Sequence, residues 1–287
     1  MARELTIRES DFGGRYRNSV EPHNTVLNDH NPLVFLVHGY NVHGNKARES
    51  YRVYEKNLLF SNRIRAEYIW KFFWPGSYKN WVKSGAYYFR QVRKSNEFGK
   101  RFAEFISTTL INSNSAAPII FVGHSLGCRV ILELLYELKK KYSTKPQHLA
   151  KLKRIKIILM AAAVPISLVK KGRRFNDLII DKLGSKHVLY STNDSVLKIP
   201  FRIGEVLASD GIWPEAVGLK GNPENIWNSP RRNTYLKHGD YWENNDNAKY
   251  FLDRYNGAVE RSLGKNQIVS EDIPGRSIKE RDMRISG

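Results

Sequence analysis

One stretch of sequence, IIFVGHSLGCRVILEL at residues 119–134, constrains the fold of this chain more than any other. Its first part, Ile119–Val122, is a continuous apolar run that predicts a buried strand. Its last part begins a helix-period pattern over Leu126–Lys141, with apolar side chains spaced four residues apart. The chain must therefore change from strand to helix within a few residues of Ser125.

The letters between strand and helix, Gly-His-Ser-Leu-Gly, match the Gly-x-Ser-x-Gly pattern of a nucleophile elbow. In that structure a tight turn holds the serine in strained backbone geometry and exposes its hydroxyl above the sheet. The residues two before and two after must be small because the strand and helix backbones nearly touch, and Gly123 and Gly127 meet this need. We therefore predict that Ser125 is a nucleophile. The alternative is a structural serine in an ordinary strand-to-helix loop.

Strand and helix patterns alternate along most of the remaining chain. The expected strands are Leu33–Val37, Tyr68–Trp74, Pro118–Val122, Ile155–Ala161 and His187–Ser191. The expected helices are Lys46–Leu59, Asn80–Leu110, Leu126–Lys141, Ala248–Leu263 and part of 164–185. Residues 200–230 are rich in Gly and Pro and are expected to be irregular. The alternation predicts an α/β fold with a mostly parallel sheet and helices on both faces.

No repeat or low-complexity linker divides the chain, so we expect one α/β domain over residues 32–263. Residues 1–31 are polar and turn-rich, and they predict an N-terminal extension or a short antiparallel hairpin. Residues 264–287 form a polar tail that we expect to be mobile. With 287 residues the chain is long enough to bury a substantial core.

A nucleophilic serine needs a base, and after a strand–turn–helix elbow the partners follow in the order serine, acid, histidine. Three histidines follow Ser125 in the sequence. His148 lies in a lysine-rich stretch without a preceding strand, and His187 begins an expected strand, where its side chain would pack. The predicted base is therefore His238, in the loop LKHGDYW before the last helix. A histidine that only holds its own loop is the alternative.

The acid is expected in a loop that directly follows a strand. Asp194, in STNDSVL, follows the last expected strand at the edge where catalytic groups of open α/β sheets gather. Asp194 could instead only cap the turn that follows it. Asp240 is a rival, although two residues from His238 it would usually serve its own loop, and Asp177 and Asp181 lie in an expected helix.

The oxyanion that forms on an attacked carbonyl needs hydrogen-bond donors. One is expected to be the N–H of Leu126, at the start of a helix whose dipole also favours negative charge. The second should come from the loop after an earlier strand, and in HGYN, residues 38–41, the N–H of Tyr40 is the candidate. Gly39 would permit the turn, and His38 would hold the loop by hydrogen bonds.

The segments HGYN, GHSLG, STNDSVL and KHGDY occur in an order that resembles the α/β-hydrolase superfamily, in its esterase and lipase-like branch. The resemblance extends from about Leu33 to Leu263. The chain also resembles a group of bacterial α/β hydrolases of undefined substrate, in which an HGYN-type segment precedes a strand that ends near Trp-Pro, as occurs here. The resemblance implies an α/β-hydrolase fold for the domain at residues 32–263. It also implies a serine hydrolase that uses Ser125, Asp194 and His238 and no cofactor.

Other chemistries have less support in the sequence. The single cysteine, Cys128, cannot form an intramolecular disulfide, and no Cys or His cluster has zinc-ligand spacing. A metal site at His38 and His43 has little support. No phosphate-binding loop, dinucleotide fingerprint or nucleic-acid-binding signature occurs. We therefore expect no metal and no cofactor.

The charge balance is unusual, with 47 Lys and Arg against 28 Asp and Glu, a formal net charge of +19. Such an excess indicates attraction to an anionic membrane surface, a nucleic acid or another acidic partner. The aromatic-rich basic segment Tyr78–Lys94 is the candidate membrane contact, although ordinary helix core is the favoured alternative for its rings. The N-terminal MARELTIRES lacks a signal-peptide pattern, and no apolar run is long enough to span a membrane.

These observations predict a cytoplasmic, basic serine hydrolase of the esterase or lipase type, which an anionic membrane surface could attract. It would cleave an ester, either a carboxylester or a lipid-like ester, through an acyl-enzyme on Ser125. The alternative is a hydrolase-like scaffold that binds nucleic acid or another acidic partner through its basic surface. The complete Ser-Asp-His set favours the enzyme.

Overall fold

The structure is a computed structural model of the 287-residue chain. It describes residues 3–9, 15–22, 31–40, 42, 44–61, 64–75, 84–112, 117–170, 172–176, 185–207, 214–221 and 231–263.

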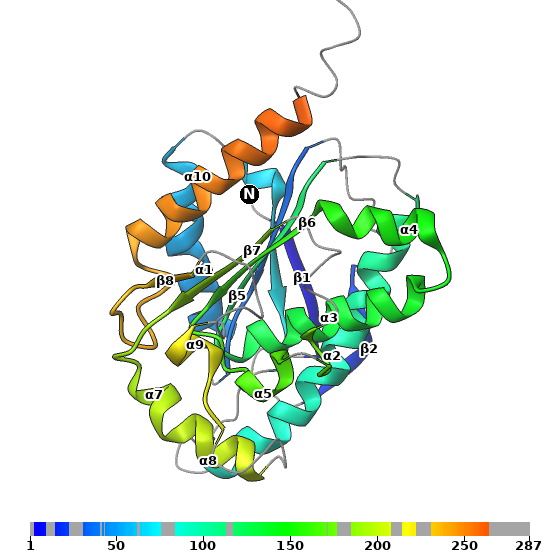
Figure 1. The fold of residues 1–287 in the computed structure, drawn as a ribbon. Coiled ribbons are helices and arrows are strands. Elements are labelled where there is room, and N and C mark those ends of the chain that lie inside the picture. The colour runs from blue at the N-terminus through cyan, green and yellow to red at the C-terminus, as the bar shows by residue number, and fades with distance from the viewer. Residues whose placement is uncertain are drawn as a thin grey trace, which may run out of the picture.

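Within these residues one sheet of eight strands runs through the molecule in the order β2-β1-β4-β3-β5-β6-β7-β8 (Figure 1). The strands are β1 (Arg3–Arg8), β2 (Tyr16–Glu21), β3 (Leu33–Val37), β4 (Ile69–Phe73), β5 (Ile119–His124), β6 (Ile155–Met160), β7 (Ser185–Tyr190) and β8 (Arg231–Asn233). Every neighbouring pair is parallel except β1 and β2, which are antiparallel. The carboxyl ends of the parallel strands therefore meet at one edge of the sheet.

Helices cover both faces of the sheet (Figure 1). α1 (Gly44–Leu59) and α10 (Asn245–Leu263) pack together on one face, and α2 (Ser84–Asn112) and α3 (Leu126–Tyr142) pack together on the other. The shorter helices are α4 (Pro146–Lys151), α5 (Ile166–Val169), α7 (Ser195–Lys198), α8 (Pro200–Leu207) and α9 (Val217–Lys220), with single 3-10 turns at Ala66–Tyr68 and Leu152–Arg154. The predicted α/β-hydrolase fold, a mostly parallel sheet between two helical layers, is confirmed. None of the helices described has the length and apolar character needed to cross a bilayer.

The central strands β3 and β5 are buried along their whole lengths. Both are continuous apolar runs, as expected for parallel strands that are covered on two faces. Phe35 of β3 stacks on Phe121 of β5 with ring centroids 5.1 Å apart. Phe102 of α2 meets both rings edge-on, at 5.8 and 5.7 Å. This aromatic cluster fixes α2 against the centre of the sheet.

The first strands of the chain are part of the same sheet. β2 pairs antiparallel with β1, and β1 pairs parallel with β4, so that Arg3 lies opposite Trp70. The N-terminal segment therefore extends the central sheet on the β4 side. A division of the chain at residues 32 and 263 stays a prediction, and the tail at 264–287 lies outside the described residues.

The expectation of irregular structure over 200–230 is wrong for α8 and α9. Pro200 is the first residue of α8, a position that suits proline because an N–H there has no acceptor within the helix. Phe201 and Glu205, four residues apart, are both buried against the core. Packing thus stabilises a helix that the Gly and Pro content argued against. The edge strand β8 was also not predicted, because three polar residues carry no apolar signal.

Two glycines let α3 start directly against the sheet. A Cβ on Gly127 would lie 2.3 Å from the carbonyl oxygen of His38 and 2.5 Å from that of Val37, at the end of β3. A Cβ on Gly123, in β5, would lie 3.1 Å from the backbone of Cys128 in α3. Strand and helix backbones meet closely, as the pattern predicts, but Gly127 contacts the neighbouring strand β3 rather than its own strand β5.

We expect Gly127→Ala to lower the free energy of unfolding by about 1–3 kcal/mol, because backbone carbonyls cannot move aside for the new methyl group. In an unobstructed helix the same change stabilises by about 1 kcal/mol, so the sign of the change, measured by urea unfolding, tests the contact. Gly239→Ala is the matched control, because a Cβ there meets no atom within 4 Å. Equal effects of the two substitutions would contradict this packing.

Candidate active site

Ser125 lies in the turn between β5 and α3, with φ of 53° and ψ of −124°. A positive φ on a residue with a side chain costs on the order of 1–3 kcal/mol. Hydrogen bonds from the adjacent segment hold this turn. The Ser125 N–H donates to the carbonyl of Met160 at 2.9 Å, and the Ser125 carbonyl accepts from the N–H of Ala163 at 3.1 Å. The end of β6 therefore maintains the strained conformation of the serine.

The hydroxyl of Ser125 does not cap α3, although a serine at this position commonly bonds to the helix backbone. Its Oγ lies 2.9 Å from Nε2 of His238 instead. On the other side of the ring, Nδ1 of His238 lies 2.7 Å from Oδ2 of Asp194. Since a carboxylate can only accept, Nδ1 carries the proton and Nε2 is left to accept from the serine hydroxyl. The three side chains form one hydrogen-bonded chain.

Asp194 is completely buried directly after β7, where it precedes α7. Its Oδ1 accepts a hydrogen bond from the N–H of Leu197 at 3.0 Å, and its Oδ2 contacts His238. The two interpretations of this aspartate are therefore compatible, since one oxygen caps the helix and the other contacts the histidine. The cap fixes the orientation in which the carboxylate meets the ring.

The other aspartates considered from the sequence do not make this contact. Asp240 is exposed in the turn that follows His238, and its backbone N–H bonds to the carbonyl of Lys237. Asp177 and Asp181 lie outside the described residues.

The two other downstream histidines have structural contacts elsewhere. His187 is buried in β7 with Nδ1 3.0 Å from the hydroxyl of Tyr250, and burial lowers its pKa to about 4. His148, in α4, stacks on the ring of Tyr142 at 5.3 Å. His238 is the downstream histidine that the structure brings to Ser125.

The loop after β3 passes directly against Ser125. A Cβ on Gly39 would lie only 2.7 Å from the Cβ of Ser125. Glycine is therefore required here for a close approach of the backbone, whereas the sequence suggested that it permits a turn. Tyr40 is the next residue of this loop, and Leu126 is the first residue of α3, where the N–H has no acceptor within the helix. Both predicted oxyanion donors thus belong to segments that adjoin Ser125.

His38 is buried at the start of this loop. Desolvation, and then the nearby Arg8 cation, hold its pKa well below the usual value, so the ring is neutral. Nδ1 donates to the carbonyl of Gly39 at 2.8 Å, and Nε2 accepts from Nη2 of Arg8 at 2.8 Å. The Trp74 indole donates to the His38 carbonyl, also at 2.8 Å. These contacts are of the kind expected for a residue that holds the loop.

Arg8, the last residue of β1, is a buried part of the site that the sequence analysis missed. Its Nε donates to the carbonyl of Trp74 at 2.7 Å, and its Nη2 donates to the carbonyl of Val42 at 3.2 Å as well as to His38. One guanidinium group thus connects the end of β4 to both sides of the loop. A single arginine in a polar N-terminal segment carries no signal of this role in the sequence.

His124 is a second missed residue, although its place inside GHSLG could have pointed to it. It is buried, and desolvation lowers its pKa to about 3, so it is neutral. Its Nε2 donates to the backbone carbonyl of His238 at 2.7 Å. Its Nδ1 would lie 3.2 Å from a Cβ on Gly39. His124 therefore lies between the loop of His238 and the loop after β3.

The cysteine near Ser125 is placed for packing rather than for reaction. Cys128 is buried with its Sγ 3.5 Å from the carbonyl of Met160, and burial raises the pKa of its thiol. Among the described residues, no group of three or more His, Cys, Asp or Glu is placed to hold a metal ion. His43, the other residue of the weakly supported metal site at His38, lies outside the described residues.

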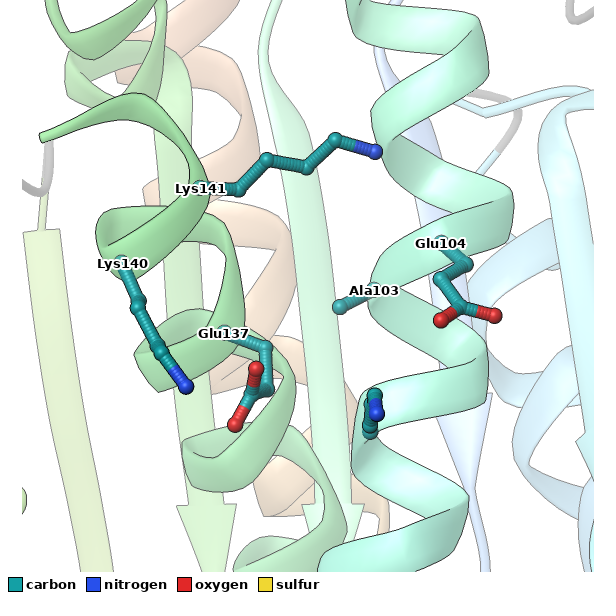
Figure 2. Close-up of a pocket in the computed structure, with 6 residues that line it drawn as sticks. Ala103, Glu104, Glu137, Lys140 and Lys141 are labelled. Carbon is teal, nitrogen blue, oxygen red and sulfur yellow. The ribbon is translucent and has the colours of Figure 1, made fainter. Parts of the chain in front are cut away.

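A pocket between α2 and α3 is separate from this site. Figure 2 shows its lining, with Ala103 and Glu104 from α2 and with Glu137, Lys140 and Lys141 from α3. Because an α-helix rises about 1.5 Å per residue, Lys140 lies roughly 20 Å along α3 from Ser125. The pocket is thus at the far end of the helix from the serine.

No curated protein matches the chain. Among solved structures, one titled "The crystal structure of the gene lin2722 products from Listeria innocua" aligns with a TM-score of 0.43 and 10% identity, over 77% of this chain and 92% of that chain.

The sequence pattern of one protein family, lecithin:cholesterol acyltransferase, matches residues 71–258. The match covers more than half of the chain, and it includes Ser125, Asp194 and His238. The chain therefore belongs to the lecithin:cholesterol acyltransferase family, which comprises lipases and acyltransferases of the α/β-hydrolase type.

Proposed function

We propose that the protein is a serine hydrolase that cleaves a lipid-like ester through an acyl-enzyme on Ser125. The observation that carries the proposal is the hydrogen-bonded chain from Ser125 Oγ to His238, 2.9 Å, and from His238 to Asp194, 2.7 Å. The family supports the substrate class, because its name describes transfer of an acyl group from a phospholipid ester. The same proposal includes membership in the group of bacterial α/β hydrolases of undefined substrate that have an HGYN-type segment.

In the first half of the reaction, Nε2 of His238 removes the proton of Ser125 while Oγ attacks the ester carbonyl carbon. The carbonyl π electrons move to oxygen, and the N–H groups of Tyr40 and Leu126 donate to the resulting oxyanion. The oxyanion then collapses, the bond to the alcohol oxygen breaks, and His238 gives its proton to the departing alcohol. Asp194 stabilises the positively charged ring through Nδ1 and keeps it oriented.

In the second half, water attacks the acyl-enzyme while His238 removes one of its protons. Collapse of the second oxyanion releases the acid, and the proton returns to Ser125 Oγ. An alcohol in place of water would give a new ester, which is the acyltransferase outcome. The mechanism uses only groups of the chain itself.

The nucleic-acid alternative has no support in the comparisons or in the described residues, because it rests on net charge alone. A cytoplasmic location stays a prediction.

The direct test is labelling with a fluorophosphonate, which reacts with activated serines, followed by hydrolysis of esters of increasing acyl chain length. We expect stoichiometric labelling of Ser125 and faster turnover of longer acyl chains. Addition of a long-chain alcohol separates hydrolysis from acyl transfer, because only transfer forms a new ester.

We expect Ser125→Ala to abolish labelling and to reduce turnover by on the order of 10⁶-fold, as when other serine nucleophiles are removed. Cys128→Ser is the control, because the thiol is buried and bonded to a backbone carbonyl. Its turnover should stay near that of the wild type. Labelling that persists in folded Ser125→Ala protein would remove this serine from the mechanism.

Asp194→Asn should lower turnover by on the order of 10³–10⁴-fold, because the amide no longer fixes the tautomer of His238. Asp240→Asn is the matched change in the exposed rival and should cost less than about threefold. Steady-state hydrolysis of a soluble ester measures both. The reverse ranking would assign the role to Asp240.

Arg8→Lys should lower kcat by about 10- to 100-fold, because the lysine cannot reproduce the contacts that position the loop after β3. KM should change little, since the loop acts on the developing oxyanion rather than on the bound ester. Arg3→Lys, on the same strand but exposed, is the control. An unchanged kcat for Arg8→Lys would show that the loop is positioned without the guanidinium.

A further inference from the structure

A row of exposed apolar side chains follows the two short helices α7 and α8. We call it the apolar rim; it consists of Val196, Ile199, Ile203 and Val206, whose exposed fractions are 38, 59, 48 and 41%. Ile199, Ile203 and Val206 are spaced four and three residues apart, and the Ile203 N–H donates to the carbonyl of Ile199, so these three side chains lie on one side of α8. Val196 precedes them in α7. In the described part of the chain, the other large exposed apolar residues are Phe60 and Tyr235.

The opposite side of the same helices is fixed to the core. Leu197, Phe201 and Glu205 are buried. The Glu205 carboxylate accepts from Nη1 of Arg129 in α3 at 3.0 Å and from the hydroxyl of Tyr88 in α2 at 3.3 Å. Separating the partners of a buried ion pair is costly, because it leaves an unpaired charge in the interior. The rim therefore cannot turn inward, and its apolar side chains stay in water unless something covers them.

The apolar rim begins next to Asp194 at the carboxyl edge of the sheet. Asp194 is the residue directly before α7, and it follows β7, whose carboxyl end lies at this edge. Tyr235, 67% exposed, precedes His238 in a loop that is tied to the same place, because the Ser191 hydroxyl donates to the carbonyl of Leu236 at 2.6 Å. Exposed apolar surface is thus concentrated beside two of the three proposed catalytic residues.

Within α7 and α8, the exposed charged side chain is basic. From Ser195 to Val206 the charged residues are Lys198, Arg202 and Glu205, and the carboxylate is the buried one. Lys198 is exposed beside the rim, while Arg202 lies 3.6 Å from Glu215. Lys237, next to His238, is also exposed. Apolar side chains with cationic neighbours are the combination that lies at the boundary of an anionic lipid layer.

We propose that the apolar rim docks the protein on an anionic lipid surface, with the Ser125 site facing the lipid from which the ester is drawn. This proposal rests on the proposed function, because hydrolysis of a lipid ester is what docking would serve. Its evidence is the apolar rim. The net charge of +19, which the triad does not explain, then attracts the protein to the surface. A nucleic acid would use the charge but not a row of valine and isoleucine.

This surface differs from the segment Tyr78–Lys94 that the sequence suggested. Part of that segment lies outside the described residues. In the described part, Tyr88 packs edge-on against Tyr40 at 5.4 Å and bonds to Glu205, so it connects the loop after β3 to α8. Tyr88 thus contacts the buried side of α8, opposite the rim.

The test is co-sedimentation with vesicles of phosphatidylcholine containing phosphatidylglycerol, compared with vesicles of phosphatidylcholine alone. The double variant Ile199→Asp/Ile203→Asp should bind the anionic vesicles at least about tenfold more weakly than the wild type, because it removes apolar contact and adds repulsion. Hydrolysis of lipid in the vesicles should fall in parallel, while hydrolysis of a soluble short-chain ester should change less than about threefold. Binding of the wild type should weaken steeply between about 50 and 300 mM salt.

Phe60→Asp is the matched control. Phe60 is the most exposed large apolar side chain described, at 88%, but it follows the end of α1, at the edge of the sheet opposite the rim. This variant should bind vesicles as the wild type does.

Equal binding by the wild type and the double variant, or equal binding to anionic and neutral vesicles, would overturn the proposal. Self-association of the wild type that the double variant abolishes, without vesicle binding, would instead assign the rim to a second copy of the chain. Turnover of soluble ester without vesicle binding would refute the docking proposal and leave the proposed function in place. Vesicle binding without fluorophosphonate labelling would refute the proposed function and leave the docking surface in place.

Discussion

The close approach of α3 to the ends of β3 and β5 sets the positions of all other groups in the site. It forces Ser125 into a positive φ, and hydrogen bonds from the end of β6 hold it there. It also brings the loop after β3 within contact of the serine, because Gly127 meets the carbonyls at the end of that strand. A side chain at Gly39 or Gly127 would separate these segments, and the serine, the loop after β3 and the start of α3 would no longer meet.

Around this turn, each buried polar side chain is held by hydrogen bonds to specific partners. His38 and His124 are neutral because desolvation penalises their charged forms, and each donates through one defined nitrogen. Asp194 divides its two oxygens between a helix cap and His238. Because a buried polar group without a partner is costly, these contacts favour a single geometry of the loops over Ser125. The site is therefore held in place before any substrate arrives.

Much of this could be predicted from local sequence. The elbow, the central strands and the long helices have strong periodic patterns, and Ser125, Asp194 and His238 were selected by chain order and by position after strands. Elements stabilised mainly by tertiary contacts were missed: α8 contains a glycine and begins at a proline but buries Phe201 and Glu205, and β8 is a polar edge strand. Arg8 and His124 were missed because their partners are distant in the sequence or are backbone atoms.

The sequence by itself determined where the chain must turn sharply, since only Gly-x-Ser-x-Gly between an apolar strand and an amphipathic helix satisfies the steric demands of that turn. It also determined the excess of positive charge. The tertiary structure decided which distant side chains meet, because the register of parallel strands brings residues 8, 38, 194 and 238 to one edge of the sheet. It also decided which face of α7 and α8 stays in water, because a buried ion pair with α3 fixes the inner face and leaves the apolar rim exposed.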